Sequence, residues 1–167
     1  PNVGKSTLLN YVLQQKISIT SRKPQTTRHQ VLGIKSEDDY QIVFVDTPGL
    51  NAQNDRAINR YLNRTASSAL RDVDVVLFVV DRMQWNNEDD YVLDRIMEAG
   101  RPVILVINKI DLLADKAELL PWLAEVATRA NFHDIVPISA LSRHNIDALE
   151  SCIVGVLPVA EFMFPAD

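Results

Sequence analysis

The chain has 167 residues, of which 47% are hydrophobic, and its formal net charge is −5. This length and apolar content suit one globular domain with a full core, and the acidic balance disfavours a nucleic-acid interface built on phosphate contacts. No apolar run approaches the roughly 18 residues that a membrane-spanning helix needs. The single cysteine, Cys152, cannot form an internal disulfide, and the apolar helical pattern around it indicates a core residue.

The chain begins with the second half of the phosphate-loop pattern G-x-x-x-x-G-K-[S/T], whose first glycine would precede the first residue. Backbone N–H groups of such a loop, with the N-terminus of the next helix, bind phosphate oxygens. Gly4 leaves room for close approach, Lys5 would reach the β- and γ-phosphates, and the Ser6 hydroxyl would bind Mg²⁺. The loop residues expected to contact a nucleotide are Asn2, Val3, Gly4, Lys5, Ser6 and Thr7. Taken alone, this half pattern also fits a chance match before an amphipathic helix.

A basic segment rich in hydroxyl groups, residues 17–29, follows that first helix. Its hydroxyl groups could complete a Mg²⁺ shell when a γ-phosphate is present, so we interpret the segment as a candidate switch. The alternative is a basic surface loop.

Residues 31–36 and 40–46 predict a β-hairpin across an acidic turn at residues 37–39. The second strand leads into Asp46, Thr47, Pro48 and Gly49. An acidic residue at the carboxyl end of a buried strand can hold a magnesium-bound water, and the N–H of the glycine could meet a γ-phosphate. The same four residues would also suit an ordinary turn.

The rest of the chain alternates between predicted helices and strands. We expect helices at residues 55–69, 88–98, 116–130 and 146–157, and strands at 75–80, 103–107 and 135–138. This alternation is typical of a mostly parallel sheet with helices on both faces, an α/β fold. Asn86 is predicted to cap the helix at residues 88–98. The acidic residues after it are expected to be structural rather than metal-binding.

Asn108, Lys109 and Asp111 follow the predicted strand at residues 103–107. The carboxylate of Asp111 can accept hydrogen bonds from N1–H and the exocyclic amine of guanine, a donor pair that adenine lacks. A site built on such a pair rejects the wrong base by about 10⁴. Asn108 could bond N7 of the base and tie neighbouring loops together, and the stem of Lys109 could lie across the base. A polar loop after a strand is the alternative.

Ser139 and Ala140 follow the last predicted strand, and their backbone amide is expected to meet O6 of guanine. Three of the four motifs come just after a predicted strand, and the phosphate loop is of the kind that follows one. Ligands of open α/β sheets bind at these carboxyl ends of the strands. In order and spacing they resemble a translation-factor-class P-loop GTPase over all 167 residues. The resemblance implies a P-loop NTPase fold, a Ras-like G domain, that binds GTP and GDP with Mg²⁺.

Further stretches, at residues 17–29, 46–50, 56–60, 134–140, 157–158 and 164–165, resemble the Era family of bacterial ribosome-assembly GTPases. The tandem GTPase Der and the tRNA-modification GTPase MnmE share the Asn-Val-Gly-Lys-Ser and Thr-Thr-Arg features. Neither usually carries the stretch from Ser21 to His29.

By this resemblance, the Mg²⁺ ligands would be Ser6, Asp46 and Thr27 (or Thr26). Asn2 would help hold an activating K⁺, and Asn2, Lys5 and Thr27 would be the residues that act in hydrolysis. Leu50 stands where Ras-like enzymes carry a glutamine that orients water. We therefore expect slow intrinsic GTP hydrolysis that K⁺ assists.

The resemblance also implies a GTP-dependent switch that acts in small ribosomal subunit assembly and rRNA maturation. The parent protein would bind small-subunit rRNA and the small subunit, in the cytoplasm, with peripheral inner-membrane association as a further option. We expect no nucleic-acid binding from residues 1–167 themselves, which lack the Gly-x-x-Gly loop of an RNA-binding KH domain.

The expected division is a G domain over residues 1–158, without its N-terminal strand, and a tail over 159–167 that leads toward a C-terminal domain. The apolar tail would either dock toward that domain or fray. Without the first strand, unpaired backbone groups would cost on the order of 1 kcal/mol or more each, so we expect these residues alone not to fold stably. Two other interpretations stay open: the G domain of another machine (a tandem GTPase, a tRNA-modifying enzyme or a metal transporter), and a non-hydrolysing interaction module.

Overall fold

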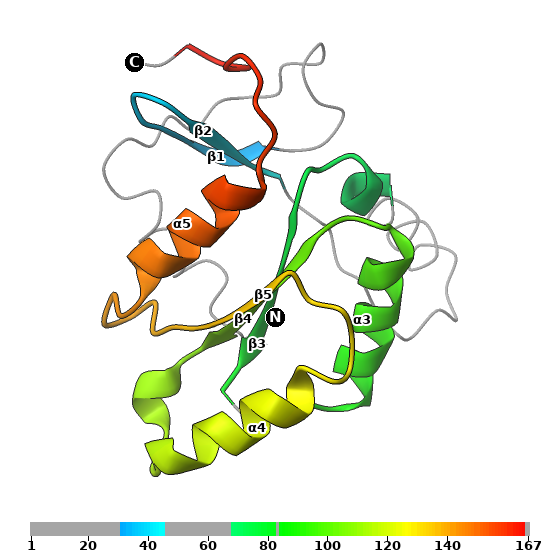
Figure 1. The fold of residues 1–167 in the computed structure, drawn as a ribbon, viewed down its shortest axis with the longest axis vertical. Helices are drawn as coiled ribbons and strands as arrows, with labels where there is room; N and C mark the ends of the chain where they lie inside the picture. The colour runs from blue at the N-terminus through cyan, green and yellow to red at the C-terminus, as the bar shows by residue number, and fades with distance from the viewer. Residues whose placement is uncertain (1–30, 46–67, 83, 166–167) are drawn as a thin grey trace.

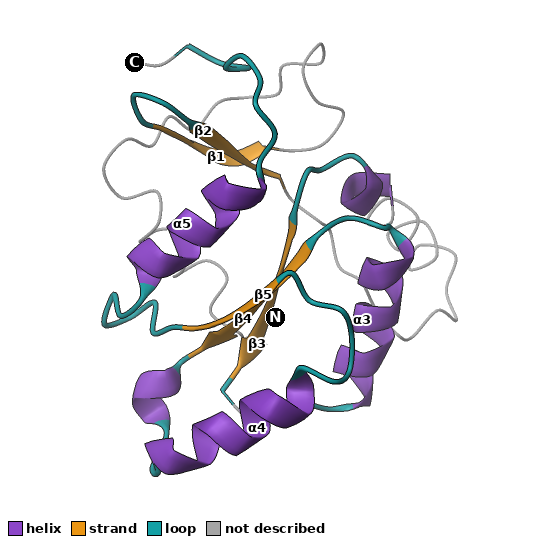
Figure 2. Ribbon diagram, viewed as in Figure 1, coloured by secondary structure: helices purple, strands orange, loops and turns teal. Residues whose placement is uncertain are grey.

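The computed structural model describes residues 31–45, 68–82 and 84–165 (Figures 1 and 2). The strands in these ranges are β1 (Val31–Ser36), β2 (Gln41–Val45), β3 (Val76–Asp81), β4 (Val103–Asn108) and β5 (Asp134–Pro137). The helices are α3 (Asn87–Glu98), α4 (Leu119–Val126) and α5 (Ile146–Val156), with 3₁₀ turns η1 (Ile110–Leu112) and η2 (Lys116–Glu118). Of the helix predicted at 55–69, only the end is described, and residues 68–71 are helical.

The strands β3, β4 and β5 form a parallel sheet with β4 in the centre. Every residue of β4 is buried, as expected for a parallel strand that is covered on both faces. Asp81 at the end of β3 lies opposite Asn108 at the end of β4, and Ile107 lies opposite Pro137 of β5. The carboxyl ends of the three strands therefore meet at one edge, from which the loops with the predicted polar motifs leave.

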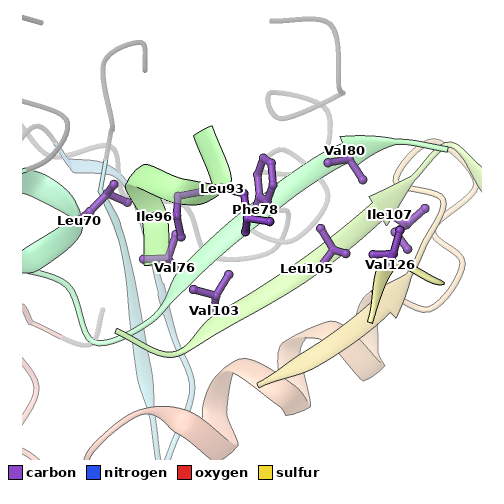
Figure 3. Close-up of a cluster of buried hydrophobic side chains, with 10 residues drawn as sticks. All are labelled: Leu70, Val76, Phe78, Val80, Leu93, Ile96, Val103, Leu105, Ile107 and Val126. Carbon is purple, nitrogen blue, oxygen red and sulfur yellow. The ribbon is translucent and has the colours of Figure 1, made fainter. Parts of the chain in front are cut away.

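Helices cover both faces of this sheet, as the alternation along the chain predicts. Ile104 and Val106 of β4 face α5 and join a cluster with Leu149 and Ile153. The intervening β4 residues face the other way, onto α3 and α4 (Figure 3). That second cluster consists of Leu70, Val76, Phe78, Val80, Leu93, Ile96, Val103, Leu105, Ile107 and Val126.

The start of α3 confirms the predicted helix cap. The side chain of Asn86 accepts a hydrogen bond from the N–H of Asp89 (3.0 Å), and the Asp89 carboxylate accepts one from the N–H of Asn86 (3.0 Å). Asp90 accepts a hydrogen bond from Nε1 of Trp85 (2.8 Å). These acidic residues are therefore structural, and the described ranges contain no group of three or more His, Cys, Asp or Glu residues suited to a metal ion.

One predicted helix is shorter in the structure, and the helix predicted to end at residue 69 continues to residue 71. The strands, α3 and α5 agree with their predicted bounds to within one residue. α4 ends at Val126 rather than at residue 130, and the 3₁₀ turn η2 replaces its predicted first turn. Pro121 has no N–H to bond the carbonyl of residue 117, so a regular α-helix cannot include the predicted first turn at residues 116–118. At the other end, the Thr128 hydroxyl donates to the carbonyl oxygen of Glu125 (2.7 Å), which competes with helical continuation.

The antiparallel hairpin β1–β2 lies beside α5 (Figure 1). Ile42 of β2 enters the cluster that α5 shares with β4. Glu150 of α5 is buried, and its carboxylate accepts hydrogen bonds from the ammonium of Lys35 (2.6 Å) and the hydroxyl of Tyr40. Burial and the hydrogen bond to Glu150 raise the pKa of Tyr40, so its phenol stays neutral and donates.

The end of the chain returns to this hairpin. The side-chain oxygen of Gln41 accepts hydrogen bonds from the N–H groups of Met163 (3.0 Å) and Phe164 (3.1 Å). Its side-chain nitrogen donates to the carbonyl oxygen of Phe164 (3.1 Å), and the Phe164 ring is 5% exposed in a cluster with Val31 and Ile34. Met163 and Phe164 are therefore held on the hairpin. The expectation of a frayed tail does not apply to these two residues.

Replacing Gln41 with alanine should loosen the tail without unfolding the domain. The substitution removes three hydrogen bonds to residues 163 and 164, each worth about 0.5–1.5 kcal/mol. In the full-length protein, amide hydrogen exchange at Met163 and Phe164 should accelerate at least tenfold. Gln84→Ala, at an exposed glutamine, is the matched control, and equal exchange rates in the two variants would contradict the role of Gln41.

Candidate nucleotide-binding site

The described motif residues gather at the carboxyl edge of the parallel sheet. Asn108 ends β4, Lys109 follows in the left-handed backbone region (φ 63°, ψ 31°), and Asp111 lies in η1. The loops after β4 and β5 are joined by backbone hydrogen bonds from Ile138 to Ile107 (2.7 Å) and from Ile110 to Ile138 (3.2 Å). Residues that are 28 or more positions apart in the chain thus form one polar surface.

Asn108 is the buried link between the two loops. Its side chain is 2% exposed, and its oxygen accepts a hydrogen bond from the N–H of Ala140 (3.0 Å). A buried polar side chain must be hydrogen-bonded, and this bond fixes the spacing of the loops. The sequence-based expectation placed the backbone amide at residues 139–140 against O6 of guanine, and a base oxygen at Ala140 would have to share this N–H with Asn108.

Asp111 presents an exposed carboxylate whose orientation is set by a neighbour. The hydroxyl of Ser139 donates to Oδ1 of Asp111 (2.8 Å) and accepts a hydrogen bond from the N–H of Ser142 (3.2 Å). Two backbone hydrogen bonds between Ser139 and His144 (3.1 and 2.9 Å) close the loop that carries this serine. A carboxylate held in this way can accept two parallel N–H donors from a planar base.

Lys109 points toward the end of β3. Its ammonium lies 3.2 Å from Oδ2 of Asp81, and Oδ1 of Asp81 lies 3.0 Å from Nε of Arg82. Asp81 is not among the site residues predicted from the sequence. The sequence shows an acidic residue at the end of an apolar strand, but its place beside Lys109 depends on the pairing of β3 with β4 in the sheet.

The other predicted site residues lie outside the described residues. They are Asn2, Val3, Gly4, Lys5, Ser6, Thr7, Thr26, Thr27, Asp46, Thr47, Pro48 and Gly49. The structure therefore brings together the base-binding half of the predicted site, namely Asn108, Lys109, Asp111, Ser139 and Ala140.

Cys152 is not part of this site. Its thiol donates to the carboxylate of Asp134 (3.0 Å), and its side chain packs against the cluster beneath α5. The hydrogen bond to Asp134, followed by burial, raises the pKa of Cys152 to about 11. The thiol is protonated near neutral pH and unsuited to act as a nucleophile. Cys152 is half-buried rather than fully within the core that the sequence predicted for it.

A family model described as "50S ribosome-binding GTPase" matches residues 1–109, from the phosphate-loop segment to Lys109. The chain belongs to this GTPase family. The match spans both the predicted phosphate loop and the first part of the base-binding loop.

GTPases named Era are similar to this chain over all 167 of its residues. Identity is 60% with the GTPase Era of Azotobacter vinelandii and 58% with that of Ectopseudomonas mendocina. In both comparisons all of the chain is covered, together with 56% of the relative, so the chain spans about half the length of the curated relatives it matches. The predicted resemblance to the Era family is confirmed.

Solved structures agree with the sequence comparisons. The chain matches a variant of Aquifex aeolicus Era bound to GDP·AlF₄⁻ with a TM-score of 0.80 and 40% identity. It matches Era in complex with MgGDPNP and nucleotides 1506–1542 of 16S ribosomal RNA with a TM-score of 0.81 and 40% identity. Each match covers 100% of this chain and 57% of the solved chain. The α/β P-loop GTPase fold predicted from the sequence is thereby confirmed.

In the part of the chain that the structure describes, no helix is both long and apolar enough to span a bilayer.

Proposed function

We propose that this chain is the GTP-binding and GTP-hydrolysing switch domain of an Era-like protein. The observation that carries the proposal is the exposed Asp111 carboxylate, oriented by Ser139 beside the buried Asn108–Ala140 link. This arrangement offers acceptors to the N1–H and amine of guanine, and the relatives at 60% and 58% identity are named as GTPases.

In this proposal the phosphates and Mg²⁺ are held by the segments that precede the base-binding loops. Lys5 binds the β- and γ-phosphates, while Ser6, Asp46 and Thr27 (or Thr26) coordinate Mg²⁺. The Era structure with MgGDPNP supports guanine nucleotide and Mg²⁺ as the ligands. A bound metal ion would neutralise charge that develops on the phosphate oxygens.

Nucleotide content and turnover test this function directly. The full-length protein should bind GDP and hydrolyse GTP, and ATP should not compete with either nucleotide. Lys5→Ala should lose nucleotide binding. The control Lys116→Ala, in the 3₁₀ turn η2, should retain it. A protein that binds neither GTP nor GDP would instead be a non-hydrolysing interaction module. Equal binding of ATP and GTP would refute the role of Asp111.

Potassium should accelerate hydrolysis. Leu50 occupies the position of the water-orienting glutamine of Ras-like enzymes and cannot orient water by hydrogen bonding. We propose that a K⁺ held by Asn2 compensates by stabilising the charge that develops on the phosphate oxygens. Single-turnover GTP hydrolysis should be at least tenfold faster in KCl than in NaCl at equal ionic strength. Asn2→Ala should remove the difference, and equal rates in the two salts for the unaltered protein would contradict the proposal.

The parent protein is proposed to act in assembly of the small ribosomal subunit and in rRNA maturation. The family description names the 50S particle, but an Era structure contains a 16S rRNA segment, and this favours the small subunit. Residues 1–158 would be the G domain and 159–167 the tail toward an RNA-binding domain. The full-length protein should cosediment with 30S rather than 50S particles in the presence of GDPNP, and the opposite distribution would refute this assignment.

We further propose a cytoplasmic location for the parent protein, with peripheral association at the inner membrane as the alternative. Cell fractionation distinguishes them, because a peripheral fraction is released from membranes by high salt.

A further inference from the structure

We propose that Asp81 is a positioning residue of the guanine site, which holds the ammonium of Lys109 and so aims its aliphatic stem at the base. The inference rests on the proposed function and adds to it a residue outside the predicted motifs. It depends on the ends of β3 and β4, which lie side by side in the parallel sheet (Figure 2).

The backbone brings Asp81 to Lys109. Asp81 is the last residue of β3 and pairs in register with Asn108, the last residue of β4. The N–H of Arg82 then donates to the carbonyl oxygen of Asn108 (2.8 Å), so the two strand ends stay bonded beyond the sheet. Lys109 adopts φ 63°, which non-glycine residues rarely do, and at this turn its ammonium comes within 3.2 Å of Asp81 Oδ2.

The Asp81 carboxylate is itself held in place. Its Oδ1 lies 3.0 Å from Nε of Arg82, and its side chain is 17% exposed. One oxygen therefore faces Arg82 while the other faces Lys109, and rotation of the carboxylate would break both interactions. A carboxylate with two such partners is a fixed anchor for a flexible cation.

Lys109 needs an anchor because its side chain is long and 32% exposed. An unrestrained lysine samples many rotamers, and ordering it on binding reduces the affinity for a ligand. With the ammonium held by Asp81, part of that ordering is complete before the base arrives. The stem of Lys109 can then cover the face of the base, whereas Asp111 reads its edge.

This division of roles predicts a specific pattern of affinities. Asp81→Asn keeps the shape of the side chain and removes its charge, so GDP affinity should fall about tenfold. The affinity for IDP, whose base lacks the exocyclic amine, should fall by the same factor. The stem of Lys109 covers the face of the base, and this contact does not involve the amine. The ratio of GDP to IDP affinity should therefore stay at its original value.

A double-mutant cycle in the full-length protein tests the link to Lys109. GDP affinity is measured for Asp81→Asn, Lys109→Met and the double variant. Because Asp81 acts through Lys109, its substitution should have no further effect once Lys109 is methionine. Asp74→Asn, an exposed aspartate at the opposite end of β3, is the matched control and should bind GDP as the unaltered protein does.

Asp81→Glu is a second variant that separates weaker binding from loss of folding, because it retains the charge and moves the carboxylate by one methylene. This variant should also bind GDP more weakly, with an unchanged melting temperature. Unaltered GDP affinity in both Asp81 variants, or fully additive effects in the cycle, would overturn the role of Asp81. If the unaltered protein bound no guanine nucleotide, the proposed function itself would be refuted, a result distinct from either of these.

Discussion

Replacing Asp111 with asparagine should change the preferred base from guanine to xanthine. The carboxylate offers two acceptors to guanine, whereas an amide offers one acceptor and one donor. The donor would meet the exocyclic amine of guanine unfavourably and the 2-carbonyl oxygen of xanthine favourably. Discrimination by such buried pairs reaches about 10⁴, so GDP affinity should fall by a factor of about 10³ to 10⁴ while XDP affinity rises.

The structure adds a reason to expect that Asp111→Asn changes the base preference without disturbing the fold. The Ser139 hydroxyl holds one side-chain oxygen of Asp111 at 2.8 Å, and an amide oxygen could accept the same hydrogen bond. The substituted side chain should therefore keep its orientation. A thermal melt should show little change, which separates altered recognition from lost folding.

Competition binding of GDP and XDP to the full-length protein measures this effect. Asp115→Asn, four positions along the chain and exposed, makes the same chemical change away from the base and can still cap the turn at Ala117. It should leave the GDP preference intact. A variant at Asp111 that still preferred GDP over XDP would show that this carboxylate does not read the base.

Replacing Glu150 with alanine should strongly destabilise the domain. The substitution leaves the Lys35 ammonium, 16% exposed, and the partly buried Tyr40 hydroxyl without their shared acceptor. Breaking a buried ion pair from one side costs about 3–5 kcal/mol. That is a large part of the roughly 5–15 kcal/mol that stabilises an ordinary domain.

Urea unfolding of the full-length protein, followed at saturating GDP, checks this expectation. Glu150→Gln should lose less stability, because an amide oxygen can still accept the hydrogen bond of Tyr40. Asp147→Ala, an exposed acid on the same helix, should change the free energy of unfolding by no more than about 1 kcal/mol. Equal stabilities for the alanine variants at 147 and 150 would show that the buried carboxylate contributes nothing.

The local elements were predictable because each depends on neighbours in the chain. The apolar run that forms β4, the acidic turn between β1 and β2, and the cap at Asn86 all act within a few residues. α4 shows the limit of such reasoning. Its apolar period continues beyond Val126, but the Thr128 hydroxyl and the missing N–H of Pro121 set its ends.

The base-binding residues were also predictable from the sequence, because Asn108, Lys109 and Asp111 are consecutive or nearly so and their residue types define what they can bind. The contacts that support these residues were not predictable. Asp81 meets Lys109 across 28 positions of the chain, Glu150 meets Lys35 across 115, and Gln41 meets Phe164 across 123. Residue types alone do not reveal such partners, since these side chains come within hydrogen-bonding distance only when strands pair in register and a helix packs against them.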